Sequence, residues 1–71
     1  MNYARHIQSH ADLLRQFVDN QLTVIGNARM GMNETVQEIR QLKHWANNYA
    51  NRHRIDFHFD WSGYLLDPSL L

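Results

Sequence analysis

The chain contains no cysteine, which excludes disulfides and thiolate-bound metals as sources of stability. Its 71 residues make a single small domain, of a size that buries only about 60% of the surface exposed by the unfolded chain. Small domains are commonly stabilised by disulfides, by a structural metal or by a partner subunit. We therefore expect self-association or binding to another macromolecule to supply stability that the chain alone lacks.

The sequence also lacks an excess of charge of either sign and lacks a long apolar run. Seven basic and seven acidic residues balance, so no global field steers the chain toward nucleic acid or a membrane surface. No stretch approaches the roughly 20 apolar residues of a membrane span, and the first residues do not resemble a signal peptide. We expect a cytoplasmic protein with no membrane partner, in which any electrostatic function is local.

Glycine and proline are scarce, and their positions divide the chain into two predicted helices and a tail. Over residues 3–25, apolar side chains recur at helical spacing, and a second apolar stripe lies beside the first. The combined apolar face is too wide to be covered by one antiparallel helix. The first stripe contains Ala4, Ile7, Ala11, Leu14, Val18 and Ile25, and the second contains Leu13, Phe17 and Val24.

Gly26 and Gly31 interrupt this pattern and predict a loop over residues 26–33. Asn33 is a suitable N-cap for a second helix over residues 34–53, with Glu34 and Glu38 in its first turns. The short connection predicts an antiparallel αα-hairpin. The apolar seam of the second helix consists of Val36, Ile39, Leu42, Ala46, Tyr49 and His53, with Trp45 beside it.

A two-helix hairpin has no interior of its own, because each helix shows half of its apolar face to water. Two copies packed together remove this exposure, and two-fold dimers are the commonest closed oligomers. The expected fold class is mostly all-α, an antiparallel two-helix hairpin that dimerises into a four-helix arrangement. The predicted dimer core consists of Ile7, Leu14, Phe17, Val18, Ile39, Leu42 and Trp45.

The tail, residues 54–71, has a different pattern. In its stretch "RIDFHFDW", residues 54–61, apolar and polar side chains alternate as in a β-strand with one dry and one wet face. No other stretch shows this alternation, so no partner strand is predicted. We expect an extended or short β-like arm with Phe57, Phe59 and Trp61 turned toward the helices. The pattern leaves open whether the arm completes the core, exchanges between subunits or binds a partner.

Histidines and aspartates occur at two spacings that bring possible metal ligands together. His6 and His10 stand four residues apart on the first helix, and Asp56, His58 and Asp60 share one face of the arm. The helical pair has no third ligand, and the aspartates also form the natural wet face of an amphipathic strand. We predict no metal and no other cofactor.

Some residue types used in acid–base and nucleophilic catalysis are neighbours in the sequence. Ser9 precedes His10, and His58 stands between two aspartates. No recognised catalytic motif surrounds them, and so short a chain has little room for both a substrate pocket and a core. We expect no enzymatic activity.

The second helix has a stripe rich in basic and amide side chains, with no acidic residue between Ile39 and Asp56. Arginine and asparagine read base edges through paired hydrogen bonds, and a dimer presents two such helices to two half-sites. The zero net charge opposes this function, because neutralising several phosphates normally requires a basic excess. The residues of this alternative, a dimeric DNA-binding regulator, are Arg40, Lys43, His44, Asn47, Asn51 and Arg54.

The tail is rich in the side chains that dominate protein interfaces, and its backbone edge permits docking by strand addition. The expected function is that of a small homodimer that binds another, unidentified protein stoichiometrically, as an inhibitor or modulator of a regulator or enzyme. An accessory protein of a phage or plasmid is one kind of protein that fits this expectation. The predicted partner-binding residues are Tyr49, Arg54, Phe57, Phe59, Trp61 and Tyr64.

Overall fold

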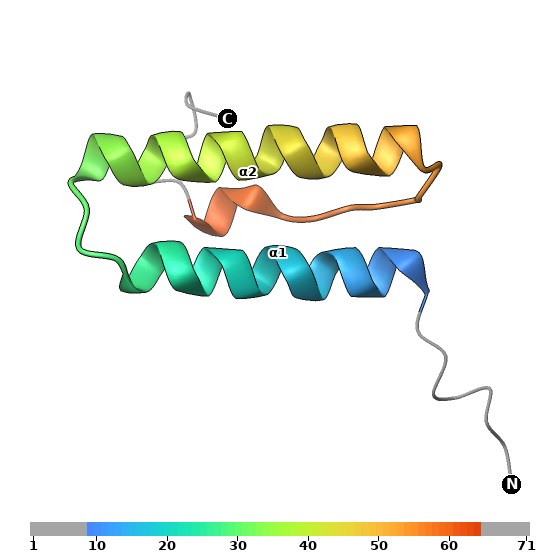
Figure 1. The fold of residues 1–71 in the computed structure, drawn as a ribbon, viewed down its shortest axis with the longest axis horizontal. Helices are drawn as coiled ribbons and strands as arrows, with labels where there is room; N and C mark the ends of the chain where they lie inside the picture. The colour runs from blue at the N-terminus through green and yellow to red at the C-terminus, as the bar shows by residue number, and fades with distance from the viewer. Residues whose placement is uncertain (1–8, 65–71) are drawn as a thin grey trace, which may run out of the picture.

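The computed structural model describes residues 9–64 and shows two antiparallel α-helices followed by a segment that returns along them (Figure 1). Helix α1 spans His10–Asn27, helix α2 spans Met32–Arg52, and a short 3₁₀ helix, η2, spans Trp61–Tyr64. The predicted mostly helical fold, with two helices packed against each other, is confirmed. His6, Ile7 and the tail from residue 65 onward lie outside the described residues.

The start of α1 is set by Ser9 and differs from the predicted start at residue 3. Ser9 has extended backbone angles, with φ −68° and ψ 160°, and its hydroxyl oxygen accepts a hydrogen bond from the Asp12 N–H at 3.1 Å. This is an N-cap, which satisfies one of the free N–H groups of the first turn. Asp12 also lies where the helix dipole favours a negative charge, and it pairs with Arg15 at 3.0 Å. Helix α1 therefore begins at His10, and the predicted start at residue 3 lies outside the described residues.

The start of α2 also differs from the sequence-based expectation. Gly31, with φ −66° and ψ 165°, is the N-cap, so Asn33 lies inside the first turn and does not cap the helix. No side chain caps this end, but the Thr35 hydroxyl donates a hydrogen bond to the Gly31 carbonyl oxygen at 3.0 Å. The connection is shorter than predicted because the helix begins as soon as the chain has reversed.

Helix α2 ends in a turn that reverses the chain. The Ile55 N–H donates to the Ala50 carbonyl at 2.8 Å, and the Arg54 N–H donates to the Asn51 carbonyl at 3.3 Å. This pair of bonds is the Schellman motif, in which the residue after the C-cap takes a left-handed conformation. Arg54 occupies that position with φ 54°, where glycine is the usual residue. The turn directs the following residues back along the hairpin.

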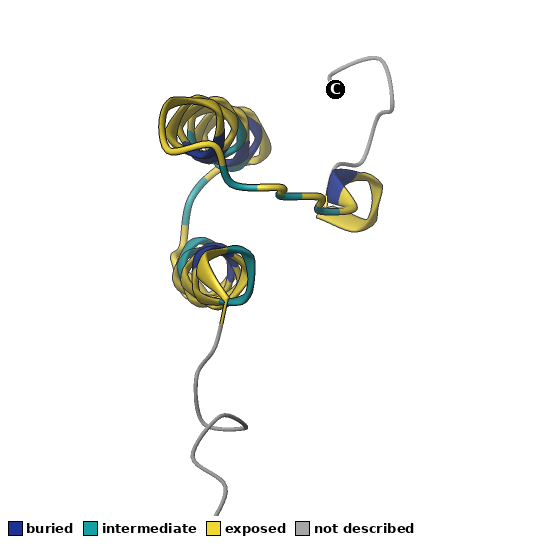
Figure 2. Ribbon diagram, turned by 90° about the vertical axis from the view of Figure 1, so that its right-hand side faces the viewer, coloured by how far each residue is buried: buried dark blue, intermediate teal, exposed yellow. Residues whose placement is uncertain are grey.

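Residues 55–64, which we call the C-terminal strap, lie against one side of the two helices as a third element (Figure 2). Its backbone from residue 55 to residue 60 is extended but pairs with no strand among the described residues. Exposure alternates along it, as the sequence pattern indicates, because only every second side chain faces the helices. Ile55, Phe57 and Phe59 are half-buried, Asp56, His58 and Asp60 are exposed, and Trp61 is 6% exposed.

The core lies where the strap meets both helices. It has no buried polar or charged residue among the described positions, and Val18 at its centre is completely buried. Each helix contributes to this cluster only the side that faces the other helix and the strap. The buried residues are Leu14, Val18 and Leu22 of α1, Val36, Ile39, Ala46 and Ala50 of α2, and Trp61 of η2.

Candidate functional site

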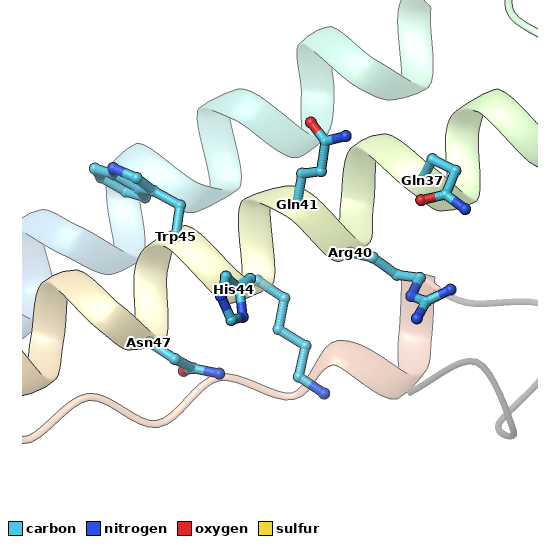
Figure 3. Close-up of a pocket in the computed structure, with 7 residues that line it drawn as sticks. Gln37, Arg40, Gln41, His44, Trp45 and Asn47 are labelled. Carbon is cyan, nitrogen blue, oxygen red and sulfur yellow. The ribbon is translucent and has the colours of Figure 1, made fainter.

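One side of the hairpin carries large apolar side chains that the strap does not cover. We call this surface the aromatic face and define it as Leu13, Phe17, Val24, Trp45 and Tyr49, each between 39% and 61% exposed. Trp45 extends from α2 on the side away from the strap (Figure 3). Monomeric soluble proteins rarely leave a large contiguous apolar patch in water, and such patches commonly mark interaction sites. The aromatic face is therefore the candidate functional site.

Ring contacts fix the geometry of the aromatic face. The ring centroids of Phe17 and Trp45 are 5.2 Å apart, so the contact joins α1 to α2. Trp45 and Tyr49 of α2 and its C-cap His53 stand four residues apart, and their rings follow one another at 5.2 and 4.3 Å. Tilted ring pairs at these distances attract each other beyond the effect of burial. The face is thus a row of mutually oriented rings.

A groove of about 430 Å³ runs along this row. Its walls are mostly apolar, and they include one histidine from α1 and the C-cap histidine of α2. A groove of this kind suits an apolar side chain or a helix from another protein, because burying such groups removes apolar surface from water. The lining residues are His10, Leu13, Leu14, Phe17, Trp45, Tyr49, His53 and Ile55.

The structure separates the predicted partner-binding residues. Tyr49 belongs to the aromatic face, whereas Phe57 and Phe59 pack half-buried against the core and Trp61 is buried in it. Tyr64 remains 45% exposed and stacks on Phe59 with ring centroids 5.8 Å apart. The rings of Phe57 and Phe59 are 6.2 Å apart, and those of Phe59 and Trp61 are 4.7 Å apart. The aromatic side of the strap is thus occupied by contacts within the chain.

The predicted dimer core is divided in the same way. Leu14, Val18 and Ile39 are buried within one chain, and Leu42 is half-buried against them. Phe17 and Trp45 are exposed on the aromatic face. Sequence reasoning did not single out Leu13 and Val24 as surface contacts, although the second apolar stripe of the first helix contained their signal.

The basic and amide side chains of α2 lie together on its outer surface. Arg40, Lys43, His44 and Asn47, four of the predicted nucleic-acid residues, line an open depression of about 510 Å³ (Figure 3). Asn51 and Arg54 are exposed but do not line it. Gln37, Gln41 and Trp45 complete its lining. Donor groups for an anionic or polar ligand are therefore gathered on one surface of α2.

The polar side of the strap has two local interactions. Nε2 of His58 and Oδ1 of Asp56 are 2.9 Å apart, and both side chains are almost fully exposed. Asp60 accepts hydrogen bonds from the hydroxyl and the backbone N–H of Ser62, and these bonds lower the pKa of its carboxyl group, with the hydroxyl bond the larger cause. Within residues 9–64, no three histidine, aspartate or glutamate side chains converge to hold a metal ion.

The residues considered for catalysis have structural contacts of their own. The Ser9 hydroxyl is the N-cap of α1, where its oxygen accepts the Asp12 N–H. His10 lies in the first turn of α1 and lines the end of the groove, so it is placed to contact a ligand of the aromatic face.

Comparison with known proteins does not assign the chain to a family. It matches no family model, no curated protein and no solved structure. No helix within the described part of the chain is both long enough and apolar enough to cross a membrane.

Proposed function

We propose that this protein acts without catalysis, by stoichiometric binding to another protein, as an inhibitor or modulator of a regulator or an enzyme. One observation carries the proposal. The aromatic face presents rings from two helices beside an apolar groove, on the side of the molecule that the strap leaves open. Tryptophan and tyrosine dominate the energetics of protein interfaces, because they bury large areas at a small entropic cost.

The contact surface in this proposal differs from the tail favoured by the sequence. The strap uses its aromatic side chains to complete the core, and Trp61 is only 6% exposed. A partner that captured the strap would have to remove Trp61 from the core, whereas the aromatic face requires no rearrangement. The face is therefore the better supported docking surface.

Affinity purification from the source cells tests this proposal. We expect the wild-type protein to capture a specific protein in equimolar amount, and the double variant Phe17→Ala, Trp45→Ala to lose it. The variant Arg40→Ala, Asn47→Ala changes a different surface of α2 and should retain the target. Helical content by circular dichroism should be unchanged in both variants. Retention of the same target by the aromatic-face variant would contradict the proposal.

A second candidate function, binding to DNA as a regulator, is favoured by the depression on α2. Arg40 and Lys43 supply positive charge there, and Asn47 supplies an amide that can hydrogen-bond a base edge. A gel-shift titration of duplex DNA at several salt concentrations tests this function. We expect Arg40→Ala with Lys43→Ala to weaken binding and to reduce the salt slope by about two. Absence of any shift at low salt would rule this candidate out.

A further inference from the structure

Two charged residues of α2, one acidic and one basic, stand at equal distances on either side of Trp45. On α2, Glu38 stands seven residues before Trp45 and Arg52 stands seven residues after it. Seven residues are nearly two helical turns, so all three side chains point to the same side of α2, with each charge about 10 Å from Trp45 along the axis. Glu38 and Arg52 are both exposed, and neither forms an ion pair with another residue of the described range.

We propose that the occupant of the aromatic face is a second copy of this chain, related by a two-fold axis that crosses the helices at the level of Trp45. The proposal rests on the proposed function, because it names the first partner of that surface, and a target protein would replace the second copy there. In this dimer, α2 of one copy lies antiparallel to α2 of the other. Glu38 then faces Arg52 of the partner subunit, and the symmetry forms the same pair twice.

Helix α1 is compatible with this arrangement. Its side on the aromatic face carries Leu13, Phe17 and Val24, with neutral side chains between them. The charged residues of α1 fall on a different side of the helix, where Asp12 and Arg15 already pair with each other. Antiparallel packing of α1 on its own copy therefore brings no like charges together.

The direction of the two-fold axis follows from these charges. An axis parallel to the helices would place α2 over α1 of the partner, where Glu38 and Arg52 would meet only neutral side chains. An axis across the helices instead brings Glu38 of each copy to Arg52 of the partner subunit. Complementary charges favour the second arrangement and set the register of the two copies.

The area of the face fits a dimer of moderate affinity. Helix α2 has 21 residues and is therefore about 32 Å long, and two helices side by side are about 20 Å wide. Each copy would then cover about 600 Å², or about 1,200 Å² in total, which is the lower end of the range for stable interfaces. Association in the micromolar range is the expected consequence.

Exchange of the two charges tests the arrangement by sedimentation equilibrium of the full chain. Glu38→Arg and Arg52→Glu should each raise the dimer dissociation constant about tenfold, because two attractive contacts become repulsive. Both the double variant Glu38→Arg, Arg52→Glu and an equimolar mixture of the two single variants should restore the wild-type value. Asp19→Arg, which reverses a charge elsewhere on α1, should leave it unchanged.

Several results would overturn the dimer. The first is that the wild-type protein remains a monomer at about 500 µM. The others are that the single charge reversals leave the dissociation constant unchanged, that the mixture does not restore association, or that Asp19→Arg weakens the dimer equally.

The proposed function is affected by different results. If the wild type is a monomer that captures its target through Trp45, the dimer alone is refuted. If the charge exchange behaves as expected while the Phe17→Ala, Trp45→Ala protein still captures its target, the proposed function alone is refuted.

Discussion

The backbone of Arg54 has a structural role that its side chain does not explain. Its left-handed conformation allows the two hydrogen bonds that close α2, and it turns the chain toward the core. A side chain at this conformation is unfavourable by about 1–2 kcal/mol because Cβ approaches the neighbouring backbone. Arg54 therefore holds a conformation that its own chemistry does not favour.

We predict that Arg54→Gly stabilises the protein by about 1 kcal/mol, because glycine adopts φ 54° without this steric conflict. Urea unfolding followed by circular dichroism measures the change. Asn48→Gly is the matched control, since Asn48 is an exposed residue inside α2, and glycine there should destabilise the helix by up to about 1 kcal/mol. A loss of stability in Arg54→Gly would show that the arginine side chain makes a contribution of its own.

The sequence predicts the ends of the helices only where a local cap determines them. Ser9 followed by Asp12 is such a signal, and it places the start of α1 correctly when capping is given priority over apolar periodicity. Arg54 gives no comparable signal, because glycine is the residue that normally marks this left-handed position. The helical spacing of apolar residues likewise does not show which of the two apolar stripes of α1 the strap covers. For that reason the sequence places Leu14 and Phe17 together in the predicted dimer core.

At the scale of elements, the strap combines an apolar and a polar side without forming a sheet. The alternation in residues 54–61 predicts an apolar side and a polar side, and residues 55–60 alternate between half-buried and exposed side chains. A period of two fits any extended segment on an apolar surface, so it does not identify what that segment packs against. Here the surface is the hairpin of the same chain, and Trp61 anchors the end of the segment.

We predict that Trp61→Ala destabilises the protein by about 3–5 kcal/mol, because it leaves a cavity between the helices and the strap. For a domain of this size that is most of the folding free energy. Tyr64→Ala is the control in the same short helix, and its 45% exposure predicts a loss of about 1 kcal/mol. Equal unfolding free energies for the two variants, measured in urea, would mean that Trp61 is not part of the core.

The contribution of Asp60 to stability depends on pH. The two bonds from Ser62 lower the pKa of Asp60, and slight desolvation opposes them. Because the folded-state pKa lies below the usual value of about 3.8, these bonds stabilise the folded chain above that pH. The stabilisation disappears as the pH falls through the lowered pKa.

The variant Asp60→Asn should therefore be less stable than the wild type near pH 6 and should approach it in stability near pH 2. Urea titrations at several pH values measure this convergence. Ser62→Ala removes the hydroxyl that donates to Asp60, so it should also be less stable than the wild type near pH 6 and should approach it near pH 2. A constant difference between Asp60→Asn and the wild type at all pH values would contradict the assignment.

At the scale of the whole molecule, each chain has covered one side of its hairpin and left the other open. The strap completes a core in the absence of cysteine, and the aromatic face remains in water. The four-helix arrangement proposed from the sequence would cover that face with a second copy. The stability of the protein should then depend on its concentration.

We predict that the melting temperature rises by about 3 °C for each tenfold increase in protein concentration, as expected for unfolding coupled to dissociation of a dimer. Thermal unfolding between about 5 and 500 µM, followed by circular dichroism, measures this dependence. Trp45→Ala should melt at a temperature independent of concentration, because it removes the centre of the proposed interface. A concentration-independent wild-type transition would show that each chain unfolds alone.

The strap also has a consequence for the order of folding. Helices α1 and α2 are neighbours in the sequence and can meet within microseconds, as local helical contacts do. Trp61 reaches the cluster of Val18 only after a loop of roughly 40 residues has closed, which carries a larger entropic cost. We therefore expect the strap to dock last and to open first, so that its amide hydrogens exchange with solvent faster than those in the middle of α2. The core of this small protein is then complete only for as long as the strap stays closed.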